Sequence, residues 1–114
     1  MQRILCGLLC SLLIGCATKP PEATEQEKQD ANLAFLACLH AAVPALDDGV
    51  SDAGTVALAL RPKCAAEFAR ASNAGASGGN PAAQAIFHRR YDDQLFMQTA
   101  TMVVLDERKH RRGQ

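Results

Sequence analysis

The charged cluster HRRYDD, from His88 to Asp93, has the residue types that acid–base chemistry needs. Within a helix, however, Asp93 lies three and four positions after Arg90 and Arg89, a spacing typical of surface ion pairs. The adjacent carboxylates Asp92 and Asp93 point in different directions from a helix, so they are poor catalytic partners. An anion site or an acid–base pair is the alternative, and we favour the surface pairs.

A second acidic group, LDDGVSD, places Asp47, Asp48 and Asp52 around Gly49 and suggests calcium. An EF-hand loop needs acidic ligands at alternate positions and a distant glutamate, and this spacing differs from that pattern. We therefore expect these aspartates to form a turn and to cap a helix.

The three histidines, His40, His88 and His110, lie on different segments, and a catalytic base would need a nucleophile nearby. No serine stands in a nucleophile elbow, and Ser51 and Ser72 flank expected turns, where hydroxyls cap helices. The sequence therefore predicts a protein that is not an enzyme, with no catalytic residues, no metal site and no cofactor.

The overall charge balance also limits the function. Lys and Arg number 12, Asp and Glu number 12, tryptophan is absent and aromatic residues make up 4% of the chain. A neutral chain gives no reason to expect nucleic acid as a partner.

The N-terminus combines a positive residue, Arg3, with an apolar run from 4 to 14 that is too short to span a bilayer. The run ends in Leu13-Ile14-Gly15-Cys16, which resembles the lipobox of bacterial lipoproteins. The resemblance implies cleavage between Gly15 and Cys16, loss of residues 1–15 as a signal peptide, and diacylglycerol and N-acyl chains, such as palmitate, on Cys16.

Two or three acyl chains, at ~0.8 kcal/mol per buried methylene, would anchor the protein durably to a membrane. Ala17 follows the lipobox cysteine, and a residue other than aspartate there implies transfer to the periplasmic face of the outer membrane. The alternatives are an ordinary signal peptide cut near Ala17, or a buried apolar helix.

If the resemblance holds, Cys6 and Cys10 would leave with the signal peptide and Cys16 would carry lipid, so Cys38 and Cys64 would be the two cysteines that remain. An exported protein meets an oxidising compartment, so we expect a disulfide between Cys38 and Cys64. Two free thiols, or half of a metal site with His40, are the alternatives.

We expect an all-α domain at 24–114, behind a lipidated linker at 16–23 that contains Pro20 and Pro21. Three helices are predicted, at about 24–43, 52–71 and 81–108. Thr24 and Glu27 form a capping box for the first helix, Ser51 or Asp52 caps the second, and Asn80 with Pro81 begins the third.

The two cysteines lie on the apolar faces of the first two predicted helices, nearly symmetric about the turn between them, so a helical hairpin would bring them together. Pro44 disfavours helix at Val43. Pro62 removes a backbone hydrogen bond inside the second helix and should kink or divide it just before Cys64.

The third predicted helix carries an apolar stripe with Phe96, Ala100 and Val103 beside it. The members of the stripe are Phe87, Tyr91, Leu95, Gln98, Met102 and Leu105. We interpret the groove around Phe87, Tyr91 and Leu95 as a candidate partner-binding site.

The chain ends in a basic tail, whose members are Arg108, Lys109, Arg111 and Arg112. Positive charge at a helix C-terminus complements the helix dipole. The alternative is contact with anionic lipid headgroups or with an acidic partner protein.

The sequence thus suggests an accessory, protein-binding lipoprotein. A pilotin-like chaperone of an envelope complex is an alternative, and a long apolar groove between the second and third predicted helices would favour it. A structural envelope protein similar to murein lipoprotein is another, although the chain lacks a sustained heptad and a C-terminal lysine. An inhibitor or immunity lipoprotein is the last.

Overall fold

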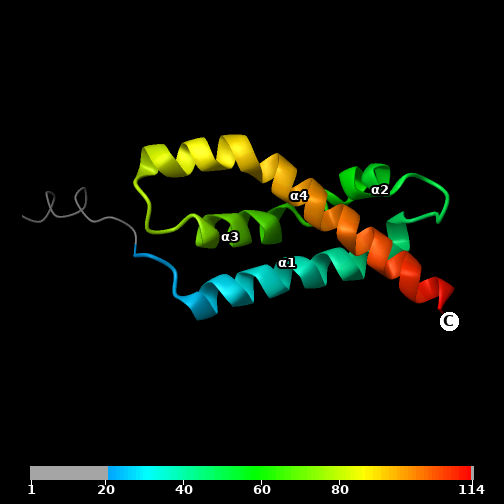
Figure 1. Cartoon of the computed structure of the whole chain (residues 1–114). Coiled ribbons are helices and arrows are strands. Elements are labelled where there is room, and N and C mark those ends of the chain that lie inside the picture. Colours follow the sequence, from blue (N-terminus) through cyan, green and yellow to red (C-terminus); the bar gives the residue numbers. More distant parts are fainter. Residues whose placement is uncertain (1–20, 114) are drawn as a thin grey trace, which may run out of the picture.

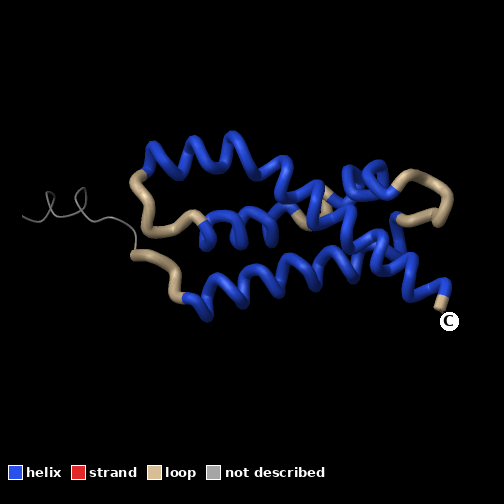
Figure 2. Tube along the Cα trace, in the orientation of Figure 1, coloured by secondary structure: helices blue, strands red, loops and turns tan. Residues whose placement is uncertain are grey.

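The computed structural model describes residues 21–113, and four helices account for most of them (Figure 1). They are α1 (Glu25–Leu46), α2 (Ala53–Leu60), α3 (Ala65–Gly75) and α4 (Pro81–Arg112). Figure 2 shows helices and connecting loops, with no strand in this part of the chain. The all-α class is therefore confirmed, whereas the expected number of helices, three, is wrong. The predicted signal peptide, Cys16 and most of the linker lie outside the described residues.

Local sequence chemistry explains where the helices begin. Thr24 Oγ1 accepts a hydrogen bond from the Glu27 amide at 3.1 Å, and the Glu27 carboxylate accepts one from the Thr24 amide at 2.7 Å. This is the predicted capping box. Asp52 caps α2 through the amides of Gly54 and Thr55, and Asn80 caps α4, with Pro81 in its first turn.

The expected second helix is divided into α2 and α3 because Pro62 has no amide hydrogen to continue the helical ladder. Lys63 and Cys64 instead both donate their amides to the carbonyl oxygen of Leu60, at 3.0 and 3.1 Å, and close a tight turn. Pro44, in contrast, does not end α1. The helix continues to Leu46. Val43, before the proline, is fully buried, and its carbonyl oxygen accepts a hydrogen bond from the Asp47 amide at 2.9 Å.

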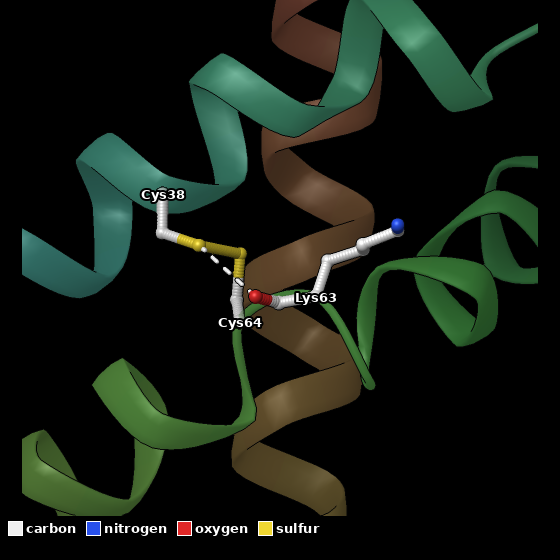
Figure 3. Close-up of a disulfide and its surroundings, with 3 residues drawn as sticks. All are labelled: Cys38, Lys63 and Cys64. Carbon is white, nitrogen blue, oxygen red and sulfur yellow. Dashed lines mark hydrogen bonds between the residues drawn. A yellow bond between two sulfur atoms is a disulfide. The ribbon is translucent and has the colours of Figure 1, made fainter.

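The disulfide between Cys38 of α1 and Cys64 at the α2–α3 turn is present, as predicted (Figure 3). The Cα atoms of the two cysteines are 5.9 Å apart. Cys64 is fully buried, and the Cys38 sulfur lies 3.7 Å from the carbonyl oxygen of Lys63. The bond therefore fixes the break at Pro62 against the middle of α1.

The helices run in alternating directions: α1 leads away from the linker, α2 and α3 return, and α4 crosses back over them (Figure 1). α1 packs mainly on α3 and α4, and α2 packs on α4. The centre of the core is an aromatic cluster in which the ring centroids of Phe35, Phe68 and Phe96 lie 5.2 to 5.7 Å apart. Small and branched residues extend this core along α1, α2 and α4, among them Leu39, Val43, Val56, Ala57, Leu60, Ala100, Val103 and Val104.

Candidate partner-binding surface

α4 has two apolar faces, and only one of them is used in the core. Phe96, Ala100, Val103 and Val104 are buried, so the residues expected beside the stripe are the ones that pack inward. The stripe itself, here called the outer stripe (Phe87, Tyr91, Leu95, Gln98, Met102 and Leu105), lies on the opposite side of the helix. Tyr91, Leu95, Met102 and Leu105 are 44%, 40%, 67% and 51% exposed.

The predicted contact residues Phe87, Tyr91 and Leu95 lie together on this outer face. The rings of Phe87 and Tyr91 are in contact, with centroids 5.3 Å apart, and Phe87 is half-buried. They do not line the neighbouring cavity, which has a volume of ≈ 320 Å³ and lies between α3 and α4. That cavity is rich in charge, with Arg61, His88, Arg89, Asp92 and Asp93 among its lining residues.

A larger and more apolar pocket, here called the α1–α4 pocket, has a volume of ≈ 480 Å³. Leu36 of α1 and Met102, Val103 and Leu105 of α4 form its apolar lining. Lys109 and Asp106 add one charge of each sign. It meets the outer stripe at Met102 and Leu105. Exposed apolar surface beside a hollow of this kind is typical of a site that another molecule covers.

A side-chain contact between two helices borders this pocket. His40 of α1 also lines it, and its Nδ1 lies 2.7 Å from a carboxylate oxygen of Glu107 on α4. The contact joins α1 to α4 beside the pocket.

The basic tail divides into two kinds of residue. Arg108 and Arg111 both bind the carboxylate of Asp47, and Arg108 Nη2 also donates to the carbonyl oxygen of Ser51 at 2.6 Å. These two arginines therefore hold the α1–α2 turn against the end of α4. Lys109 lines the α1–α4 pocket and Arg112 is exposed, so these two are free to face a partner.

The Asp47 carboxylate is buried, and hydrogen bonds from Arg108, the Gly49 amide and Arg111 keep its pKa well below its usual range, against the opposing effect of burial. The sequence predicted only the turn, which the bond from the Gly49 amide confirms at 3.0 Å. It missed the pairing with the arginines. The sequence does contain the residues of this pairing: a carboxylate one turn after Val43, and two arginines three residues apart. To link them, one must know that α1 and α4 end side by side.

Ser72, His88 and Asp92 form a second group that the sequence did not connect. Ser72 was expected to flank a turn and cap a helix, but it lies within α3 and is buried. Its hydroxyl donates to Asp92 at 2.5 Å and lies 3.0 Å from His88 Nδ1, which is itself 3.1 Å from Asp92.

These are the residue types of a Ser-His-Asp triad, but the geometry differs from one. In a triad the serine bonds Nε2 while the acid orients Nδ1, whereas here both meet Nδ1. Because the serine hydroxyl donates to the carboxylate, the group works as a polar clamp between α3 and α4.

Asp93 also has a partner other than the ones expected. It pairs with Arg61 at 2.5 Å, rather than with Arg89 or Arg90 on its own helix. The Arg61 guanidinium lies over the ring of Phe96, 5.3 Å from its centroid, and links the α2–α3 turn to α4.

Comparison of the chain with protein-family models, curated proteins and solved structures found no match. Within residues 21–113 no helix is long and apolar enough to cross a membrane. The same residues contain no group of three or more histidine, cysteine or acidic side chains placed to hold a metal ion.

Proposed function

We propose that this protein is a small lipoprotein, anchored through acyl chains on Cys16 to the periplasmic face of a bacterial outer membrane. The lipobox at 13–16, the short apolar run before it and Ala17 after it support this proposal. The disulfide between Cys38 and Cys64 also supports it, because such bonds form and persist in oxidising compartments.

At the membrane the protein acts as a non-catalytic accessory module that binds another envelope protein. The α1–α4 pocket, with the exposed side chains of Met102 and Leu105 at its edge, is the observation that carries this proposal. A partner would insert apolar side chains between α1 and α4, and polar groups of the partner would meet Lys109 and Asp106, which also line the pocket.

A pilotin-like role is the second candidate, because the α1–α4 pocket is an apolar site between helices of the kind that accepts an amphipathic segment. The groove expected for that role lay between the second and third predicted helices. The cavity at that position, between α3 and α4, is lined largely by charged side chains, so the α1–α4 pocket is the apolar site that supports this candidate.

The anchor is tested with the full chain expressed in a Gram-negative host that is fed a labelled fatty acid. The expected result is label on the wild-type chain in the outer-membrane fraction, and loss of both label and membrane association in Cys16→Ser. Label that persists in the variant would contradict the anchor.

The binding role is tested by crosslinking in intact cells, purification of the lipidated chain and mass spectrometry. Leu36→Glu puts a charge into the pocket from α1, and Leu58→Glu, at a residue of α2 that is 56% exposed, is the matched control. We expect one partner at near-stoichiometric yield with the wild type and with Leu58→Glu, and its loss with Leu36→Glu. The same set of abundant proteins from all three would overturn the proposal.

A further inference from the structure

The chain lacks a sustained heptad, but the exposed residues of α4 between Tyr91 and Leu105 have the spacing of a coiled coil. From Tyr91 the members of the outer stripe alternate in spacing by four and three, through Leu95, Gln98 and Met102 to Leu105. Four of the five are large side chains that are 40% to 67% exposed, and Gln98 between them is exposed as well. These five positions are here called the heptad stripe.

A repeat of this kind has a specific physical meaning. Alternating steps of four and three give an average of 3.5 residues, which keeps apolar side chains facing one neighbouring helix when two helices supercoil. The core-facing residues of α4 lie on the opposite side, so the repeat serves no helix among the described residues. It therefore indicates a helix from another molecule.

We propose that this helix is α4 of a second copy of the protein, and that the two copies pair in parallel. The polar member of the stripe fits this arrangement. In a parallel pair in register Gln98 faces its own equivalent, and the two amides can donate to and accept from each other, which fixes the register.

The charge pattern along the middle of the stripe also fits an identical partner. The flanking side chains that would meet across a parallel pair are Gln94 with Thr99, and Thr101 with Asp106. Neither combination brings like charges together. Identical copies often do so, because the same charged residues occur on both helices. The next position in the repeat is Lys109, where two ammonium groups would repel, so the pairing ends after Leu105.

The parallel direction rests on the proposed lipid anchor. The Ala23 amide donates to Ser77 Oγ at 2.9 Å, which holds the end of the linker at the loop that precedes α4 (Figure 1). The N-terminus of α4 is therefore the membrane-proximal end of the helix. Two copies anchored in the same leaflet then point their α4 helices in the same direction.

The pairing also affects the α1–α4 pocket, because Met102 and Leu105 belong to both surfaces. A second α4 packed on these residues would add an outer wall to the pocket. Two anchors in one assembly would double the acyl chains that hold it in the membrane.

The test is site-specific crosslinking of the full chain in intact cells with a short bismaleimide. Leu95→Cys and Leu105→Cys place thiols at opposite ends of the heptad stripe, and Leu58→Cys on α2 is the control. In a parallel pair each of the first two variants reacts with its own copy, so we expect a product of twice the chain mass from each, at least tenfold above the control. Equal yield from Leu58→Cys, or no product from either α4 variant, would overturn the proposal.

Mixing the variants tests the direction. Co-expressed Leu95→Cys and Leu105→Cys chains with distinguishable tags give crosslinks mainly between chains of the same variant in a parallel pair. A product found only between unlike chains would show an antiparallel pair and would overturn the parallel arrangement.

A further substitution tests the register. Gln98→Glu places two carboxylates opposite each other and should reduce the Leu95→Cys product at least tenfold, whereas Leu58→Glu should leave it unchanged. An unchanged yield with Gln98→Glu would contradict pairing through this face. Failure of pairing would leave fatty-acid labelling and the Leu36-dependent capture unaffected, so it is distinguishable from failure of the proposed function.

Discussion

Asp47 and Arg108 are 61 residues apart in the sequence, and two hydrogen bonds join their side chains, from Nε at 3.1 Å and from Nη2 at 2.7 Å. The Asp47 side chain is fully buried, and Arg111 binds the same carboxylate. The pairing closes the α1–α2 turn onto the last turns of α4. It therefore joins the C-terminal end of α1 to the C-terminal end of α4, at the end of the domain that is farthest from the linker.

The first prediction concerns removal of this charge. Asp47→Asn keeps the shape of the side chain but leaves two arginines facing a neutral amide. Breaking a buried ion pair by removing one partner is strongly destabilising, and because the arginines are partly exposed we expect a loss of about 2–3 kcal/mol. Urea unfolding at neutral pH, followed by circular dichroism, measures it.

Asp106→Asn is the matched control, because the Asp106 side chain is half-exposed and pairs only with His110 nearby on its own helix. We expect a change within about 0.5 kcal/mol for this variant. Equal losses for the two variants would show that the buried carboxylate has no special role.

The second prediction is a loss of stability in acid. The pKa of Asp47 is held well below its usual range, by Arg108 first, and that of Asp48 is lowered by its hydrogen bonds to Ser51. Because both folded-state pKa values lie below the unfolded ones, the folded protein binds fewer protons, and its extra stability is present above pH of about 4. The free energy of unfolding should fall as the pH decreases below about 4.

Asp47→Asn removes most of this dependence, so the free energy of unfolding of the variant should change less than that of the wild type between pH 5 and 2. Unfolding curves measured at each pH compare the two proteins. A variant that follows the wild-type curve in parallel would assign the acid sensitivity to other carboxylates.

The third prediction concerns the disulfide. The bond closes a segment in which the cysteines are 26 residues apart, and the chain-entropy relation gives a stabilisation of about 3–4 kcal/mol for a loop of this length. Replacing both Cys38 and Cys64 with alanine should lower the free energy of unfolding by about that amount. Intact mass with and without reduction and alkylation checks the bond itself, and two free thiols in the wild type isolated from the envelope of a Gram-negative host would contradict it.

The fourth prediction separates the two apolar faces of α4. Phe96 is buried between Phe35 and Phe68, and truncation of such a residue to alanine costs about 3–5 kcal/mol. Phe87 is half-buried outside that cluster, so Phe87→Ala should cost less than about 1.5 kcal/mol. Denaturant unfolding compares the two, and a larger loss for Phe87→Ala would mean that the outer face is structural.

Much of the local structure could be predicted because it depends on neighbouring residues. The capping box at Thr24 and Glu27 and the start of α4 at Asn80 follow from short-range hydrogen bonds that the sequence specifies directly. The disulfide followed from the expectation of an oxidising compartment together with the helical register of the two cysteines. The break near Pro62, predicted as a kink or a division, followed from a missing amide, and the structure shows the division into two helices.

The features that were missed depend on how the helices pack. α4 has two apolar faces, and periodicity alone does not say which of them meets α1 and α2. The small side chain of Ala100, fully buried, belongs to the face that packs inward. The same reason hid the partners of Asp47, Ser72 and Asp93, each of which finds its main contact on a different helix. The packing of the helices shows which of the candidate binding residues already have a partner within the chain and which remain exposed.

The bond between Cys38 and Cys64 has a further consequence for the timing of folding on the proposed route of export. In a reducing cytoplasm the thiols stay apart and the domain lacks about 3–4 kcal/mol of its stability, a large share for a domain of this size. A nascent chain in that condition unfolds readily and can be threaded through a translocation channel. Oxidation on the far side would then join α1 to the α2–α3 turn, so the redox step would favour the folded domain only after export.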